Sequence, residues 1–84
     1  MKRAARVDVT AKALTAVARK LGVQVLLLGG GPIDAVWHWR GKVWLVDYKS
    51  PKGGLTETQA RLVTDGWPIT FVRTTDDVLN LVSR

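Results

Sequence analysis

Apolar and polar residues follow different periods in successive segments of the chain. Between residues 8 and 21 the apolar positions recur every three to four residues, which is typical of a helix with one buried face. Asp8 or Thr10 can cap the start of this helix, and Gly22 can end it. The run VQVLLL, residues 23–28, is short and apolar and predicts a buried strand that closes at three glycines and a proline.

Two segments rich in β-branched and aromatic residues come next, at residues 33–39 and 42–49. They flank Arg40 and Gly41 and predict a β-hairpin. After a loop, the stretch LTETQARLVTDG predicts a second helix, because Thr56 and Gln59 have the spacing of a capping box.

The remaining residues predict one more strand and one more helix. WPITFVR reads as a fourth strand, and TTDDVLNLVSR as a last helix capped by Thr75. The predicted order αβββαβα has no internal repeat and no linker. It predicts a single α/β domain over residues 1–84, with a mixed sheet flanked by helices.

Length and composition limit the possible classes of protein. A chain of 84 residues that is 46% hydrophobic fits one small domain. Such a domain buries only about 60% of its unfolded surface, so a homodimer would add stability. The absence of cysteine excludes disulfides, thiolate metal sites and a cysteine nucleophile. No signal-peptide pattern or bilayer-length apolar run is present, so we expect a soluble cytoplasmic protein without a membrane partner.

The charge of the chain is strongly basic. Thirteen Lys and Arg against seven Asp and Glu give a formal net charge of +6. This charge favours a polyanionic partner, with nucleic acid the leading candidate. A basic surface that serves only solubility is the alternative.

The hairpin places two acids and a lysine in otherwise apolar strands. If Arg40 and Gly41 are the two loop residues, opposed positions have numbers that add to 81, and Asp34 opposes Asp47. Asp47 and Lys49 then share one face. Opposed carboxylates destabilise a sheet, but Mg²⁺ would neutralise them and bind their oxygens.

Other interpretations of these residues remain open from spacing alone. A three-residue loop would shift the register by one. Asp34 can instead cap the glycine turn, and Asp47 with Lys49 can form a simple surface ion pair. His38 shares the face of Asp34 but, as a lone histidine, is more often structural.

The residues PID at 32–34, DYK at 47–49 and LTETQ in the second helix resemble the PD-(D/E)xK nuclease signature. The resemblance is strongest to short phage members of the VRR-NUC family, the virus-type replication and repair nucleases, and extends over nearly the whole chain. It implies a restriction-endonuclease-like αβββαβ core, here followed by a short C-terminal helix. It also implies an endonuclease that uses Mg²⁺ or Mn²⁺ to hydrolyse phosphodiester bonds and is selective for branched DNA such as four-way (Holliday) junctions. The same resemblance implies a homodimer in a bacterial or phage-infected cell.

The resemblance also implies roles for individual residues. Asp34 matches the acid of the PD motif, with Ile33 inserted before it. Asp47 and Lys49 match the acid and the lysine of (D/E)xK, and Tyr48 would offer its backbone carbonyl to the metal. Gln59 matches a helix glutamine near the active site, although it can equally be only the second half of a capping box.

One departure from the family pattern decides how far the resemblance extends. The family usually has a Glu in the first helix, whereas Asp8 is the only acid there. Either Asp8 substitutes, or metal affinity is weakened, or the chain is an inactive nuclease-fold module that binds nucleic acid or a protein partner.

Flanking phosphates of DNA are expected to contact basic residues outside these motifs. The candidates are Lys2, Arg3 and Arg6 near the start of the chain and Lys52 in the loop after DYK. The tryptophans Trp37, Trp39 and Trp44 are expected on the hairpin face opposite the acids, where helices or a second subunit would cover them.

Overall fold

The computed structural model describes the backbone of residues 2–83 and the side chains of residues 11–83. Its elements are α1 (Lys2–Lys20), β1 (Gln24–Leu27), β2 (Ala35–Trp39), β3 (Lys42–Tyr48), α2 (Glu57–Thr64), β4 (Ile69–Val72) and α3 (Thr75–Val82). The order αβββαβα predicted from the sequence is confirmed.

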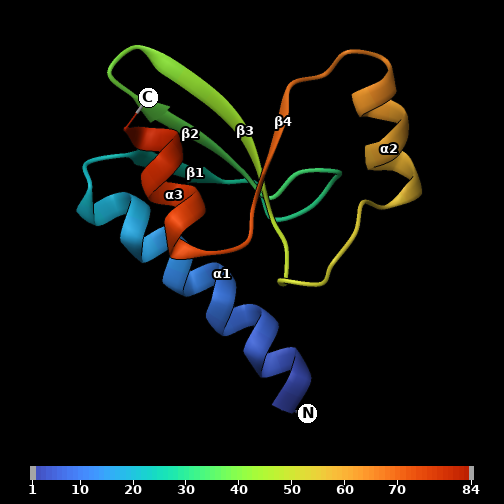
Figure 1. Cartoon of the computed structure of the whole chain (residues 1–84), viewed down its shortest axis with the longest axis horizontal. Helices are drawn as coiled ribbons and strands as arrows, with labels where there is room; N and C mark the ends of the chain where they lie inside the picture. The colour runs from blue at the N-terminus through green and yellow to red at the C-terminus, as the bar shows by residue number, and fades with distance from the viewer. Residues whose placement is uncertain (1, 84) are drawn as a thin grey trace.

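The four strands form one mixed sheet in the order β1-β2-β3-β4. The first three strands are antiparallel, whereas β4 runs parallel to β3 and is reached through α2. Helices α1 and α3 lie together against one face of the sheet, and α2 lies apart from them (Figure 1). No helix in the described part of the chain is long and apolar enough to cross a membrane.

The β2–β3 hairpin has the two-residue turn that the sequence predicts. Arg40 and Gly41 both have positive φ, 49° and 80°, as a turn matched to the twist of the strands requires. Trp39 therefore pairs with Lys42, and Ala35 pairs with Val46. These pairs establish the predicted register.

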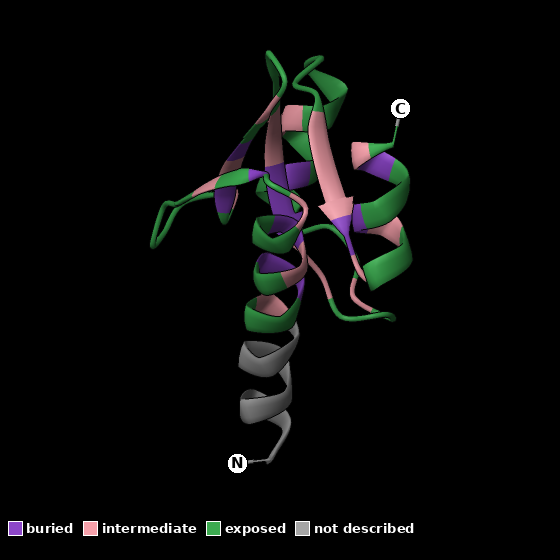
Figure 2. Cartoon of the chain, turned by 90° about the vertical axis from the view of Figure 1, so that its left-hand side faces the viewer, coloured by how far each residue is buried: buried purple, intermediate pink, exposed green. Residues whose placement is uncertain are grey.

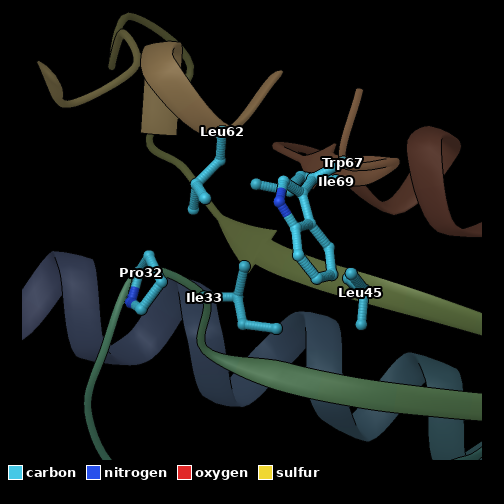
Figure 3. A pocket seen from close by; sticks show the side chains of 6 residues that line it. All are labelled: Pro32, Ile33, Leu45, Leu62, Trp67 and Ile69. Atoms are coloured by element: carbon cyan, nitrogen blue, oxygen red, sulfur yellow. The ribbon is translucent and has the colours of Figure 1, made fainter. Parts of the chain in front are cut away.

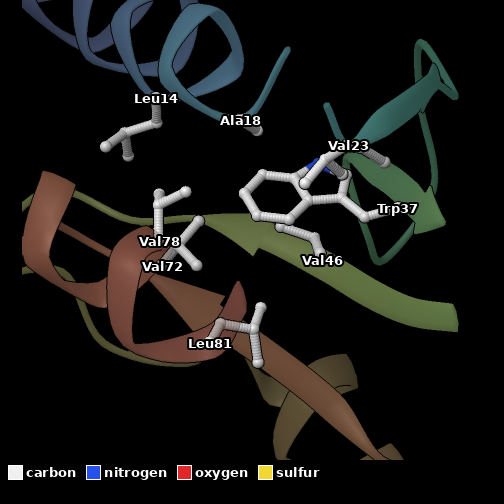
Figure 4. Close-up of a cluster of buried hydrophobic side chains, with 9 residues drawn as sticks. Leu14, Ala18, Val23, Trp37, Val46, Val72, Val78 and Leu81 are labelled. Carbon is white, nitrogen blue, oxygen red and sulfur yellow. The ribbon is translucent and has the colours of Figure 1, made fainter. Parts of the chain in front are cut away.

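The hydrophobic core lies between the sheet and the pair α1 and α3. Figure 2 shows buried residues on the sides where these elements meet, and Figure 4 shows Trp37 at the centre of the cluster. Its buried members are Leu14, Ala18, Val23, Ala35, Trp37, Val46, Val72, Val78 and Leu81. Trp39 and Trp44 are partly buried against this cluster. Helices of the same chain thus cover the tryptophan face of the hairpin.

Three predicted element ends are wrong. Helix α1 begins at Lys2, so Asp8 and Thr10 lie inside the helix and not at its start. Thr74, rather than Thr75, caps α3, because Thr74 has extended backbone and its hydroxyl accepts from the amide of Asp77. Strand β4 begins only at Ile69, after Pro68, which has no amide to donate to a neighbouring strand.

Candidate functional site

Asp34 and Lys49 lie at the same end of the sheet, because β2 and β3 are antiparallel. Asp34 directly precedes β2 and Lys49 directly follows β3. The main-chain amide of Asp34 donates to the carbonyl of Val46 at 3.0 Å. Its carboxylate Oδ2 accepts from the amide of Tyr48 at 2.9 Å. Asp34 therefore joins the two strands where their ladder ends, and it does not cap the glycine turn.

Asp47 and Lys49 form an ion pair, with Lys49 Nζ 3.1 Å from Asp47 Oδ2. The pair is not a surface one, because Asp47 is only 5% exposed and the Lys49 side chain is 12% exposed. Burying two charged groups is costly unless other polar groups also satisfy them.

Gln59 supplies that additional partner and is itself only 4% exposed. Its Oε1 accepts from Lys49 Nζ at 2.7 Å and from the amide of Thr56 at 3.1 Å. Its Nε2 donates to the carbonyl of Pro32 at 2.7 Å. Gln59 therefore completes the capping box of α2 and also connects Lys49 to the loop before Asp34.

The two carboxylates are close enough to influence one another. The pKa of Asp34 is raised above its ordinary value of 3.8, chiefly because partial burial disfavours the charged form. The neighbouring Asp47 carboxylate raises this pKa further, whereas the Tyr48 amide and Lys49 lower it without cancelling the rise. A raised pKa at a paired carboxylate is common where a site holds a cation or moves a proton.

Beside these polar residues, α2 leaves an apolar pocket over the sheet. The pocket has a volume of about 270 Å³ and opens between α2 and the strands β3 and β4. Figure 3 shows its lining side chains, which are Pro32, Ile33, Leu45, Leu62, Trp67 and Ile69. Helix α2, which carries Gln59, therefore packs on the sheet less closely than α1 and α3 do.

The hydrogen bonds that hold Tyr48, and through it Asp34, are not predicted from the sequence. Thr15 of α1 is buried, and its hydroxyl donates to the hydroxyl of Tyr48 at 2.7 Å. Trp37 Nε1 donates to the same hydroxyl at 3.3 Å. These bonds hold Tyr48, whose amide holds Asp34. Thr15 lies on the apolar stripe of its helix, which is the only signal in the sequence that it is buried.

The other predicted site residues are not brought to the acid pair. His38 is exposed and lies four residues along β2 from Asp34, about 13 Å away at the rise of a strand. Lys52 is exposed in a turn, and Arg73 holds that turn by donating to the carbonyls of Ser50, at 2.9 Å, and Gly53.

The remaining predictions concern residues near the start of the chain. The side chains of Asp8, Lys2, Arg3 and Arg6 lie outside the described residues. Their predicted roles stay predictions.

The donor set suits a hard divalent cation, although it is small. Residues 11–83 contain no group of three or more His, Cys, Asp or Glu side chains that could hold a metal ion. The pair Asp34 and Asp47 offers carboxylate oxygens, which Mg²⁺ and Mn²⁺ prefer, and Mg²⁺ commonly uses only one or two protein carboxylates with water and phosphate oxygens. Because the Asp47 carboxylate helps to raise the pKa of Asp34, added positive charge beside Asp34 would be favourable.

Comparison with protein-family models, curated proteins and solved structures finds no match to this chain. The likeness to PD-(D/E)xK nucleases therefore depends on the motif residues themselves.

Proposed function

We propose that the protein is a Mg²⁺- or Mn²⁺-dependent endodeoxyribonuclease that hydrolyses phosphodiester bonds. One observation carries the proposal. Two carboxylates thirteen positions apart in sequence meet at one end of the sheet, beside a lysine that a buried glutamine holds in place. An ordinary surface would not gather these groups at the cost of burying two charges.

Asp34 and Asp47 would hold the metal ion, with the backbone carbonyl of Tyr48 as the further ligand that the motif implies. The bound ion would polarise the scissile phosphate and lower the pKa of a coordinated water. Asp34 is preset for this role because the Tyr48 amide fixes one of its oxygens.

Lys49 would orient the attacking water and balance the charge that develops on the phosphate. Its ammonium group has three protons, and Asp47 and Gln59 accept two of them. The third can donate to a water or a phosphate oxygen. Because the group is already positioned, its interaction with the transition state needs little reorganisation.

Branched DNA is the substrate that we propose, with four-way junctions as the preferred form and a homodimer as the active species. A twofold dimer would present two identical sites, which suits the approximate symmetry of a junction. The net charge of +6 supports a nucleic-acid partner. A subunit contact would have to use a surface other than the tryptophan face, which the core occupies.

One observation favours a second candidate function, an inactive nuclease-fold module that binds nucleic acid. Lys49 already neutralises Asp47, and the described residues bring no third carboxylate to the pair. A metal ion would then have little to gain at the site.

Metal binding and cleavage separate the two functions. Calorimetry should detect Mn²⁺ binding to the wild type that Asp47→Ala removes and that Asp76→Ala, an exposed acid on α3, leaves intact. Four-way DNA should be cut faster than linear DNA with Mg²⁺ or Mn²⁺, and neither should be cut with EDTA. Lys49→Ala should abolish cutting while keeping most of the DNA affinity. DNA binding without Mn²⁺ binding or cleavage would support the inactive module instead.

A further inference from the structure

Helix α1 concentrates the positive charge of the molecule. Six of the thirteen Lys and Arg residues lie within Lys2–Lys20, together with one of the seven acids, so the helix carries five of the six net charges. By contrast, α2 contains one Glu and one Arg, and α3 contains two Asp and no cation. A basic surface that served only solubility would not need this uneven distribution.

A groove of about 560 Å³ runs along α1 on the side that meets the strands. Three exposed cations border it, namely Lys12, Arg19 and Lys20. No acidic side chain lines it, and its floor includes Leu27 and Tyr48. The groove is therefore cationic at its rim and largely apolar at its base.

We propose that this groove binds the sugar-phosphate backbone of a nucleic acid. Lys12 and Lys20 are two turns apart on one side of the helix, a span of about 12 Å at 1.5 Å per residue. One strand of B-DNA presents about three phosphates over that length, at roughly 3.4 Å of axis each. Lys12 stands at one end of this span and Arg19 with Lys20 at the other, so the three cations can contact phosphates at both ends of such a stretch.

The position of the groove connects it to the acid pair. Tyr48 lines the groove through its side chain, and its main-chain amide holds the carboxylate of Asp34. Thr15, which also lines the groove, donates to the Tyr48 hydroxyl. A backbone that follows α1 therefore passes the end of β3 at Tyr48, on the face of the sheet opposite the side chains of Asp47 and Lys49.

The inference rests on the proposed function only for the choice of nucleic acid as the partner, since it needs no cleavage. Binding of a labelled 20-base-pair duplex is to be measured by fluorescence anisotropy in EDTA, over a series of salt concentrations. The test variant is Lys12→Gln/Arg19→Gln. The matched control is Arg40→Gln/Arg61→Gln, which removes the same charge from exposed positions at the hairpin turn and on α2.

We expect the groove variant to bind at least about tenfold more weakly than the wild type at 0.1 M salt. The slope of log K against log salt should fall by about two, since each lost phosphate contact removes about 0.9 from it. The control should change both quantities much less. Lys20→Gln, which alters a single exposed side chain, should lower the slope by about one.

Equal losses of DNA affinity in the two double variants, or a wild type that does not bind DNA, would overturn the proposal that the groove binds DNA. Preferential binding to anionic lipid vesicles over the duplex would overturn it as well. If the wild type cleaves DNA and the two double variants bind DNA equally well, the groove proposal is refuted and the proposed nuclease function stands. If binding depends on the groove but no DNA is cleaved, the groove proposal stands and the proposed nuclease function is refuted.

Discussion

The two faces of the sheet differ in how they are covered. Against the inner face, α1 and α3 bury Trp37, Val46 and Val72 almost completely. On the outer face, α2 leaves an apolar pocket of about 270 Å³, and Leu26 and Val43 are each 63% exposed. Yet the outer side holds the buried polar groups Asp47 and Gln59. The buried residues of the inner face thus stabilise the fold, while the buried residues of the outer face position charged groups.

The largest expected effect is a loss of stability from a substitution on the inner face. Trp37→Ala should lower the free energy of unfolding by about 3–5 kcal/mol, because the side chain is 0% exposed and its removal leaves a large cavity. That is a large part of the 5–15 kcal/mol typical of a domain. Urea denaturation measures the change.

Trp67→Ala is the matched control on the outer side, where the indole is 55% exposed. It should cost less than about 1 kcal/mol. Equal losses from the two substitutions would contradict the division between the faces.

The second prediction compares two capping boxes, one on each side of the sheet. Gln59 and Asp77 are both the third helical residue of a box. Each change to Ala should lower stability by about 0.5–2 kcal/mol through the lost cap. Only Gln59→Ala should also lower kcat, by about tenfold to a hundredfold with KM nearly unchanged, because it loses a hydrogen bond to the charged Lys49.

Steady-state cleavage of a four-way junction measures the difference. Gln59→Glu keeps an acceptor for Lys49 and should recover part of the rate. If Asp77→Ala slows cleavage as much as Gln59→Ala does, Gln59 acts on stability alone and does not position the lysine.

The sequence predicts the elements and the hairpin register because these depend on local patterns. Arg40 and Gly41 determine the turn, and the turn determines that Ala35 faces Val46. The capping box of α2 is equally local, since Thr56 and Gln59 are three residues apart.

The remaining contacts of the site depend on tertiary packing. No spacing indicates that Gln59 reaches the Pro32 carbonyl, 27 positions away, or that Thr15 meets Tyr48 across 33 positions. The start of α1 is not predicted from the sequence either. Its first residues lack the apolar period that indicates a helix over residues 8–21.

The smallest expected effect concerns the charge of Asp34. Because its pKa is raised in the folded protein, ionisation of this carboxyl works against folding. The contribution of the Asp34 carboxyl to the stability of the fold is complete below the ordinary pKa of 3.8. This contribution is lost as the pH rises through the raised pKa. Asp34→Asn, which can still accept from the Tyr48 amide, should therefore raise the thermal midpoint at neutral pH and leave it unchanged below about pH 3.5.

Millimolar Mn²⁺ should make the thermal midpoint of the wild type higher than that of Asp34→Asn. The ion stabilises whichever folded state binds it, so it should raise the midpoint of the wild type and leave that of Asp34→Asn unchanged. Thermal scans at pH 3.5 and 7, with and without Mn²⁺, measure both effects, and Asp76→Asn should show neither. A wild type that is more stable than Asp34→Asn at pH 7 without metal would mean that the paired acids cost the fold nothing. The outer face would then need no cation to balance them, which is the opposite of what a metal site requires.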